Sequence, residues 1–398
     1  MASLLLIVIY IAFISLGLPD SLLGAAWPVM YQEIGASVSW AGILSMIIAA
    51  GTIVSSLASD KLTRKLGTGM VTAISVCLTA IALFGFSVSH SFWALCLWAV
   101  PYGLGAGSVD AALNNFVALH YPSRHMSWLH CMWGIGSSIG PMLMGWAITG
   151  GYHWNGGYQI ISLIQFLLTA MLFVSLPLWK KVSASHLPTN GIHQQASSDV
   201  TLLWILKRKG VKEVLICFFC YCALETTAGM WATSYCTIYR GIPSEQAVRW
   251  ASLFYLGITG GRFVSGFLTM KINDRNMIRL GQAVTAAGLL SVMLPLGNGF
   301  LFWGLLFIGC GCAPIYPSII HETPANFGKN LSQLIIGVQM ASAYLGTCVI
   351  PPVFGLLAQY ITISIFPLFL LIFLVIMILM SERLHKVTSQ SKKILKTA

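Results

Sequence analysis

Charged side chains are scarce in this sequence. Lys, Arg, Asp and Glu together account for 8% of its 398 residues, whereas about 25% is usual for soluble globular domains. Hydrophobic residues account for 57%. This composition excludes a soluble globular domain and indicates a protein that crosses a lipid bilayer many times. The net charge of +11 does not indicate nucleic acid as a partner, because basic loops beside apolar spans explain it.

Patterns that signal an enzyme or a cofactor are also missing. The ten cysteines lie mostly in apolar segments and lack the spacing of metal ligands. Cys217 and Cys220 form a C-x-x-C pair inside an apolar run, which we interpret as packing rather than redox chemistry. No nucleophile–base pair is visible either. We therefore expect a protein that is not an enzyme and that binds no metal and no cofactor.

Hydropathy predicts twelve membrane-spanning helices, because a helix of about 20 apolar residues crosses the hydrocarbon core. The predicted spans are 3–31, 39–59, 68–88, 92–119, 127–150, 157–179, 212–239, 247–270, 277–297, 299–320, 331–359 and 361–381. The only long polar stretch follows the sixth span. We therefore expect an all-α polytopic fold with a six-helix bundle over 1–180, a cytoplasmic linker over 181–211, and a second six-helix bundle with a short basic cytoplasmic tail over 212–398.

The distribution of Lys and Arg predicts the orientation of the chain in the membrane. If the N-terminus is cytoplasmic, every basic residue falls in a cytoplasmic loop or tail except Arg240, Arg249 and Arg262. Because Lys and Arg concentrate in cytoplasmic loops, both termini are expected on the cytoplasmic side. We expect a multi-pass protein of a bacterial cell (inner) membrane, with the lipid bilayer as a partner.

The two halves of the sequence are similar at a fixed spacing. A shift of 210 residues aligns Trp40 with Trp250 and continues to align residues up to the eleventh predicted span. Before the second span the shift is 205, and it aligns Asp20 with Glu225, each four residues before a glycine. With six spans in each half, the two repeats have the same orientation in the membrane and are related by an axis along its normal.

Three acidic residues lie well inside predicted spans, namely Asp20, Asp110 and Glu225. An acid at the centre of a spanning helix costs roughly 2.5–3.5 kcal/mol, so it normally faces a polar cavity, has a partner or carries a proton. We predict that these three residues couple transport to protons. An alternative for Asp20 is a local helix break at Pro19-Asp20-Ser21, in which the carboxylate caps the helix that follows.

Amides and aromatic side chains accompany these acids. Asn114 lies one helical turn after Asp110, so the carboxylate and the amide can address one ligand hydroxyl. Acids, amides and aromatic rings suit a sugar, which presents hydroxyls at its edge and C–H groups on its faces. The predicted substrate-binding residues are Asp110, Asn114, Asn115, Trp27, His130, Trp133, Trp231, Tyr235 and Gln339.

Several of these residues have a structural alternative. Asp110 could instead bond Asn115 or a neighbouring span, and His130 could either relay protons or pack in the core. A tryptophan near the end of a span is often an interfacial anchor, and Gln339 could hold two helices together. Arg262 is the only basic residue clearly inside a span. It either forms a gating salt bridge with an acid on the cytoplasmic side or extends its head group to the interface.

The loop between the second and third spans resembles the signature of the major facilitator superfamily. The signature G-x-L-A-D-R-x-G-R-K corresponds to S-L-A-S-D-K-L-T-R-K over residues 56–65. Asp60, Arg64 and Lys65 match, whereas Ser56 and Thr63 replace the glycines. The resemblance covers essentially the whole chain. It implies that Asp60 and Arg64 stabilise the outward-facing state and therefore gate, as Arg262 also could, rather than bind substrate.

Within that superfamily the sequence is most similar to the fucose permease group of sugar/proton symporters. Those proteins have an acid in the first span, matched by Asp20, and an acid in the fourth span after a Gly-Leu-Gly run, matched by Asp110. The run from Trp128 to Gly136 in the fifth span is also similar. The resemblance implies that Asp20 carries the proton and that Asp110 links protonation to the sugar. Asp110 is one methylene shorter than the Glu often found there, and Glu225 is outside the pattern.

The sequence therefore predicts a proton-coupled symporter of a monosaccharide or related polyol that works by alternating access, as a monomer. Sodium is an open alternative as the coupling ion, because carboxylates and amide oxygens also suit a hard cation. The runner-up is a proton/drug antiporter, since Gly136-x-x-x-Gly140-Pro141-x-x-x-Gly145 resembles the antiporter motif of the fifth span. The acids and amides in the spans argue against an apolar drug pocket. No feature favours a lipid flippase or a sensor.

Overall fold

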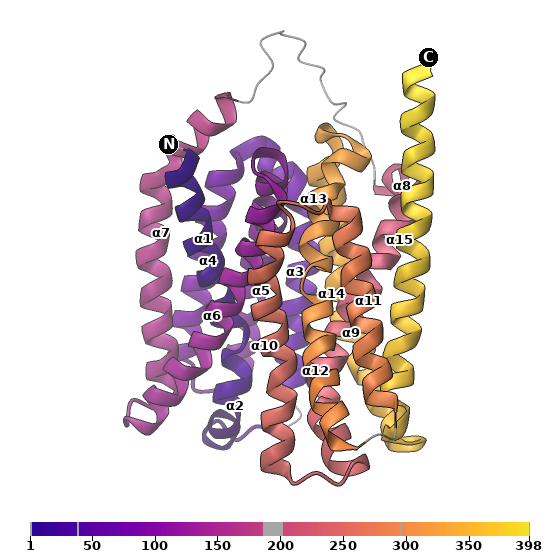
Figure 1. Cartoon of the computed structure of the whole chain (residues 1–398). Helices are drawn as coiled ribbons and strands as arrows, with labels where there is room; N and C mark the ends of the chain where they lie inside the picture. Colours follow the sequence, from indigo (N-terminus) through magenta and orange to yellow (C-terminus); the bar gives the residue numbers. More distant parts are fainter. Residues whose placement is uncertain (1, 38–39, 186–201, 295–296, 398) are drawn as a thin grey trace. The chain divides into compact units, whose positions relative to one another are not determined.

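The computed structural model describes residues 2–37, 40–185, 202–294 and 297–397, and within these ranges it contains helices and no strand (Figure 1). The helices are α1 (Ala2–Asp20), α2 (Leu22–Glu33), α3 (Ala41–Leu66), α4 (Thr68–Ser87), α5 (Phe92–His120), α6 (Ser123–Thr149), α7 (His153–Ser185), α8 (Leu202–Leu206), α9 (Val211–Ser234), the π-helical turn η2 (Tyr235–Tyr239), α10 (Ser244–Leu268), α11 (Asp274–Met293), α12 (Asn298–Cys312), α13 (Ile315–Phe327), α14 (Lys329–Tyr360), the 3₁₀ turn η3 (Ile363–Ile365) and α15 (Phe366–Thr397).

Helices cover every predicted span. Among the described residues, nine stretches are long and apolar enough to cross a membrane. The other three predicted spans are α6, α10 and α11, of 27, 25 and 20 residues. These three helices contain more polar residues, which lowers their hydropathy but not their length. The all-α polytopic fold is thereby confirmed.

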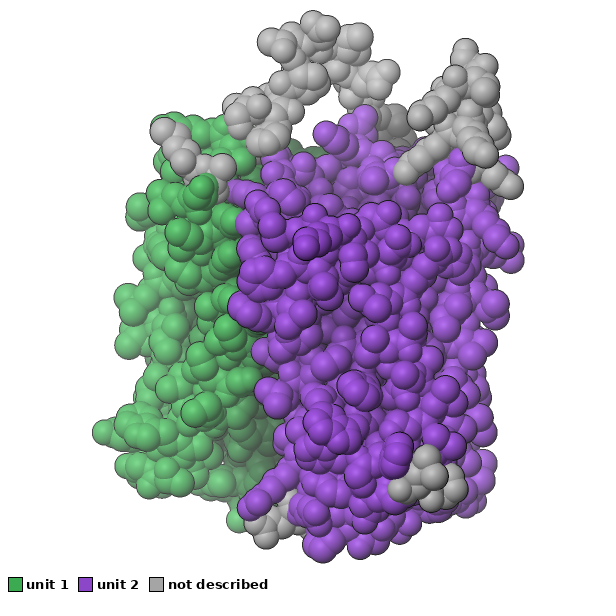
Figure 2. Space-filling model, in the orientation of Figure 1, with its two compact units in different colours: residues 1–116, 129–194 green, residues 117–128, 195–398 purple. Residues whose placement is uncertain are grey.

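The chain divides into two compact units, which Figure 2 shows in different colours. Unit 1 comprises residues 1–116 and 129–194, and unit 2 comprises residues 117–128 and 195–398. Most of the predicted linker, residues 186–201, lies outside the described residues. The predicted boundaries of the two bundles and the linker therefore stay a prediction.

Each unit is held together by packing between neighbouring helices. In unit 1, α4 packs along α7. In unit 2, α9 packs against α14 and α15, and α12 packs against α10 and α11 (Figure 1). The contact of α9 with α10 brings together two of the residues singled out above, Glu225 and Arg262.

The first predicted span is broken at the position that the sequence suggested. The helix α1 ends at Asp20 and α2 begins at Leu22, with Pro19 in the last turn of α1. Proline has no N–H to donate, which removes one hydrogen bond from this end of α1. The hydroxyl of Ser21 donates to the backbone oxygen of Ser137 at 2.7 Å. The break therefore sets Asp20 at the end of a helix and ties it to α6.

Glycines let α1 and α6 approach backbone to backbone. A Cβ atom added at Gly17 would overlap the carbonyl oxygen of Trp133, and one added at Gly136 would overlap that of Ile14. At Gly140 the added atom would overlap the carbonyl oxygen of Leu18. Small residues at this spacing are typical of close helix pairs in membranes. Packing therefore accounts for Gly136 and Gly140 of the glycine run that resembles the antiporter motif, whereas nothing lies within 4 Å of a Cβ atom at Gly145.

This packing predicts a difference between two glycines of one helix. Gly136→Ala is expected to lower the free energy of unfolding by about 1–3 kcal/mol, because the new methyl group must displace the backbone of α1. Gly145→Ala is the matched control on α6, since nothing lies within 4 Å of a Cβ atom there. Thermal unfolding of the purified protein in detergent measures both. Equal melting temperatures for the two variants would contradict the close α1–α6 contact.

Candidate functional site

Asp20 is an exposed carboxylate held in place by a neighbouring helix. Its side chain is exposed, and the indole Nε1 of Trp133 on α6 donates to its Oδ2 at 2.8 Å. The close approach of α1 and α6 at Gly17 and Gly136 brings these two side chains together. The sequence suggested either a proton-coupling carboxylate at Asp20 or a helix break in which Asp20 caps the following helix. The break is present, and the Asp20 carboxylate accepts a hydrogen bond from Trp133. The structure thus brings together two predicted site residues.

Asp110 begins a chain of hydrogen bonds inside unit 1. The side-chain nitrogen of Asn114 donates to Asp110 Oδ1 at 2.8 Å and to the Asp110 backbone oxygen at 3.0 Å. The side-chain oxygen of Asn114 lies 3.0 Å from His130 Nε2 on α6. Asn114 is 0% exposed and His130 is 6% exposed, and the ring of Phe13 meets the imidazole edge-on at 5.5 Å. Three predicted site residues therefore form one buried network.

The geometry fixes the direction of this network. Because the nitrogen of Asn114 donates to Asp110, its oxygen can only accept, so His130 must donate through an Nε2–H group. The tautomer is thus assigned from the network. In a low-dielectric interior, such linked bonds polarise one another. The two hydrogen bonds therefore connect Asp110 to His130 through Asn114.

Two other predicted residues of unit 1 are buried. Trp27 is 5% exposed within the apolar core of unit 1, and its ring centroid lies 6.4 Å from that of Tyr31. Asn115 on α5 is 6% exposed. A role of Trp27 and Asn115 in substrate binding stays a prediction.

In unit 2, Glu225 on α9 and Arg262 on α10 form an ion pair. Arg262 Nη2 lies 3.3 Å from Glu225 Oε1, and the two side chains are 4% and 19% exposed, respectively. One partner of Arg262 is therefore an acid within the spans, and the guanidinium is buried. A gating role of Arg262 stays a prediction. Only the position of Glu225 in the repeat, not its partner, could be read from the sequence.

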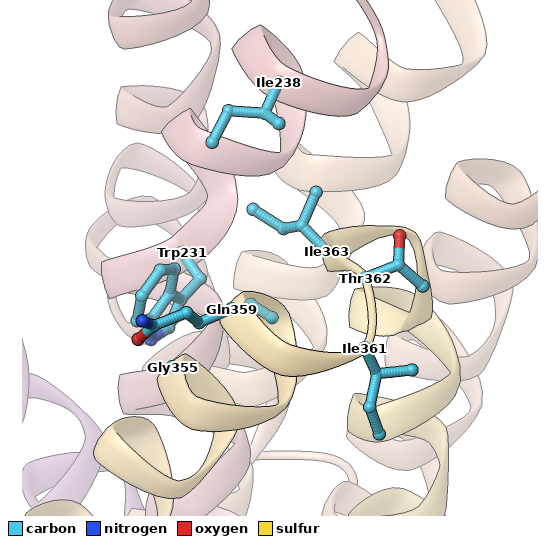
Figure 3. Close-up of a pocket in the computed structure, with 8 residues that line it drawn as sticks. Trp231, Ile238, Gly355, Gln359, Ile361, Thr362 and Ile363 are labelled. Atoms are coloured by element: carbon cyan, nitrogen blue, oxygen red, sulfur yellow. The ribbon is translucent and has the colours of Figure 1, made fainter.

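Trp231 lines a pocket of about 420 Å³ between the end of α9 and the end of α14 (Figure 3). Figure 3 shows Trp231 on α9 and Gln359 near the end of α14 among the residues that line this pocket. The indole N–H of Trp231 donates to the backbone oxygen of Pro351 at 3.0 Å. The lining residues are Trp231, Ile238, Gly355, Ala358, Gln359, Ile361, Thr362 and Ile363. Of the predicted binding residues, only Trp231 lines it.

Tyr235 and Gln339 are buried in unit 2. Tyr235 is 1% exposed, its ring centroid lies 5.1 Å from that of Phe366, and the guanidinium of Arg240 lies 5.8 Å from its centroid. Gln339 is 0% exposed, and its Oε1 accepts a hydrogen bond of 3.1 Å from Thr323. Gln339 therefore links α14 to α13, which is the structural alternative considered for it.

The predicted gating residues of the second-to-third-span loop pair with each other. Arg64 Nε lies 3.0 Å from Asp60 Oδ2 across one turn of α3, with side chains 39% and 10% exposed. The Asp60 carboxylate is buried whereas Arg64 is partly exposed. The gating role of this pair stays a prediction.

A cluster at one end of unit 2 was missed by the sequence analysis. Asp274, the first residue of α11, accepts from the hydroxyl of Ser123 and contacts His321 Nδ1 at 2.7 Å. His321 Nε2 lies 3.2 Å from the backbone oxygen of Tyr121. The His321 ring therefore lies between the Asp274 carboxylate and the backbone oxygen of Tyr121. No spacing in the sequence signals this cluster, because its residues come from three separate segments.

Among the described residues, no group of three or more His, Cys, Asp and Glu side chains is arranged to hold a metal ion.

Comparison with known proteins identifies the family. The model of the Major Facilitator Superfamily matches residues 9–351. "Bypass of stop codon protein 6" of Saccharomyces cerevisiae is 22% identical over 391 residues, covering 90% of this chain and 78% of that protein. The hexuronate transporter of Bacillus subtilis is 19% identical over 306 residues, covering 75% and 71%.

A solved structure has the same fold. The E. coli fucose:proton symporter FucP superposes with a TM-score of 0.75 at 14% identity, covering 96% of this chain and 98% of that one. At this identity the likeness shows the fold alone. Because the family model spans most of the sequence and the helices follow the FucP fold, this chain belongs to the Major Facilitator Superfamily and is a multi-pass membrane transporter, not an enzyme.

Proposed function

We propose that this transporter moves a sugar, either a monosaccharide or a related polyol, together with a proton by alternating access. The observation that carries the proposal is the buried network from Asp110 through Asn114 to His130. It joins a titratable carboxylate to an amide and an imidazole, which are the groups that bind hydroxyls and respond to a proton. The names of two similar proteins, a fucose:proton symporter and a hexuronate transporter, support a sugar as the substrate class.

Asp20 and Asp110 have different roles in this proposal. Asp20 is exposed although it lies within a spanning segment, and a carboxylate at that depth requires access to water or a partner. It therefore serves as the proton carrier, with Trp133 holding its carboxylate. Asp110 links the proton to the sugar. A protonated Asp110 gains an O–H donor and keeps an oxygen that accepts from Asn114, so it can donate to a sugar hydroxyl while Asn114 still holds it.

We further propose that both termini are cytoplasmic, that the membrane is that of a bacterial cell, and that the transporter works as a monomer. It needs no cofactor besides its coupling ion. Two polar neighbours of Asp110, Asn114 and His130, are unsuited to lipophilic cations. We therefore place sugar/proton symport ahead of drug export.

The test is uptake into proteoliposomes that are alkaline inside. A gradient of one pH unit is worth about 1.4 kcal/mol per proton, so one proton per sugar gives about tenfold accumulation. Labelled hexoses and deoxyhexoses are expected to accumulate, and a protonophore is expected to abolish the accumulation. A parallel experiment with a sodium gradient and no pH gradient identifies the coupling ion. Expulsion of lipophilic cations without any movement of sugar would contradict the proposal and favour the drug antiporter.

A further inference from the structure

A basic turn, residues 204–212, joins α8 to α9 (Figure 1). The side chains of Lys207, Arg208 and Lys209 are consecutive and exposed. The spanning segment that contains α9 begins directly after them, at Val211. Because the end of a span lies at the boundary between hydrocarbon and water, these basic side chains lie at the level of the lipid headgroups.

The backbone of the basic turn is held by hydrogen bonds and by buried neighbours. The N–H of Arg208 donates to the carbonyl oxygen of Ile205 at 3.0 Å, and the N–H of Val211 donates to that of Arg208 at 3.2 Å. Ile205 and Val211 are 0% exposed. Gly210 has a φ of 90°, and a Cβ atom there would lie 3.2 Å from Leu384 Cδ1 on α15. The basic side chains between these anchors therefore project outward from a fixed backbone.

An exposed aromatic ring accompanies the basic side chains. Trp204 on α8 is 50% exposed, and the guanidinium carbon of Arg208 lies 5.4 Å from its ring centroid. A tryptophan is favoured at the headgroup level because its ring is amphipathic, and a cation is attracted to the face of the ring. A guanidinium also suits phosphate, because two parallel N–H groups can bind two of its oxygens. The turn thus combines a ring for the interface with a donor for a phosphate.

The protein does not neutralise the positive charge of the turn. Among the described residues, no acidic side chain forms an ion pair with any of its four basic side chains, which are Lys207, Arg208, Lys209 and Lys212. The acid that follows them in the chain, Glu213, instead pairs with Arg383 of α15 at 3.0 Å. The four cations therefore remain available to an external anion.

We propose that the basic turn binds the phosphate-bearing headgroup of an anionic phospholipid. A lipid is favoured over a soluble anion because Trp204 and the start of a spanning segment place the cations at the membrane surface. An anionic lipid is favoured over a zwitterionic one because each basic residue near an anionic surface strengthens binding about fivefold. This inference goes beyond sugar transport and does not depend on which substrate is moved.

The test measures the melting temperature of the purified full chain in detergent micelles that contain increasing fractions of one lipid. Phosphatidylglycerol and phosphatidylcholine with the same acyl chains are compared. A lipid that binds the folded protein raises its melting temperature, and we expect this effect from phosphatidylglycerol and not from phosphatidylcholine. Raising the salt concentration from about 0.1 to about 1 M shortens the screening length from about 10 to about 3 Å, so the effect of phosphatidylglycerol should weaken in the wild-type chain.

Two double variants locate the site. Lys207→Gln with Lys209→Gln removes two cations of the turn and is expected to weaken the apparent affinity for phosphatidylglycerol about 25-fold. The matched control is Lys180→Gln with Lys181→Gln at the end of α7. These two lysines are also exposed and also follow a tryptophan, but Trp179 is 4% exposed and offers no ring at the interface. The control should bind as the wild type does, and both variants should fold because they change exposed side chains.

Four results would overturn the inference. An equal effect of phosphatidylcholine means that the headgroup charge does not matter, and an equal effect of glycerol 3-phosphate means that the turn binds a soluble anion. Equal losses in the two double variants mean that attraction is spread over the whole surface. An effect of phosphatidylglycerol that does not change with salt means that the cations do not carry it. Each of these results leaves the proposed transport of a sugar with a proton intact.

Discussion

Replacing Asp110 by Asn is expected to abolish accumulation of the sugar against its gradient. At one pH unit the ratio of internal to external sugar should fall from about tenfold to one, which is a loss of about 1.4 kcal/mol of coupling. The amide of Asn has the shape of the carboxylate and can still bond Asn114, but it cannot take up and release a proton. Exchange of labelled for unlabelled sugar without a pH gradient should therefore continue.

The control for Asp110→Asn is a second change from carboxylate to amide in unit 1. Glu33, at the end of α2, accepts a hydrogen bond of 2.6 Å from the indole of Trp154, just as Asp20 accepts from Trp133, and it has no role in the proposed mechanism. Glu33→Gln should retain accumulation. The measurement is uptake of labelled sugar into proteoliposomes that contain equal amounts of folded protein. Accumulation by Asp110→Asn at the wild-type level would remove Asp110 from the coupling mechanism.

Local features of the structure could be predicted from the sequence. The length and apolar character of a segment decide whether it can span a bilayer, so a helix occurs at each predicted span. The break beside Asp20 lies in the Pro19-Asp20-Ser21 segment that the sequence singled out. Asn114 lies over Asp110 because residues four apart share one face of a helix. Each of these predictions depends only on residues close together in the chain.

Features that depend on contacts between helices could not be predicted in the same way. Glu225 and Arg262 are 37 residues apart, and no periodicity indicates that these positions meet. The bond from Trp133 to Asp20 depends on how closely α1 and α6 pack. The core position of Trp27 depends on its neighbours in space, because a tryptophan near the end of a span fits a core, an interface or a binding site equally well.

The charges of the Glu225–Arg262 pair also determine stability. Arg262→Met is expected to lower the free energy of unfolding by about 3–5 kcal/mol, because it leaves the Glu225 carboxylate buried without its partner. The double variant Glu225→Met with Arg262→Met is expected to recover most of this loss, since apolar side chains that replace both members of a buried pair are often neutral or stabilising. The recovery distinguishes loss of a charge partner from loss of side-chain packing.

An ion pair of the same unit that is partly exposed on both sides provides the reference for this experiment. Arg279 Nε lies 2.6 Å from Glu382 Oε1, and the two side chains are 46% and 32% exposed, so Arg279→Met should change stability by at most about 1 kcal/mol. Unfolding of the purified proteins in detergent measures the change in the free energy of unfolding for Arg262→Met, for the double variant and for the reference variant on one scale. If Arg262→Met is as stable as Arg279→Met, the charge of Glu225 does not depend on Arg262, and the contact between α9 and α10 does not rest on this ion pair.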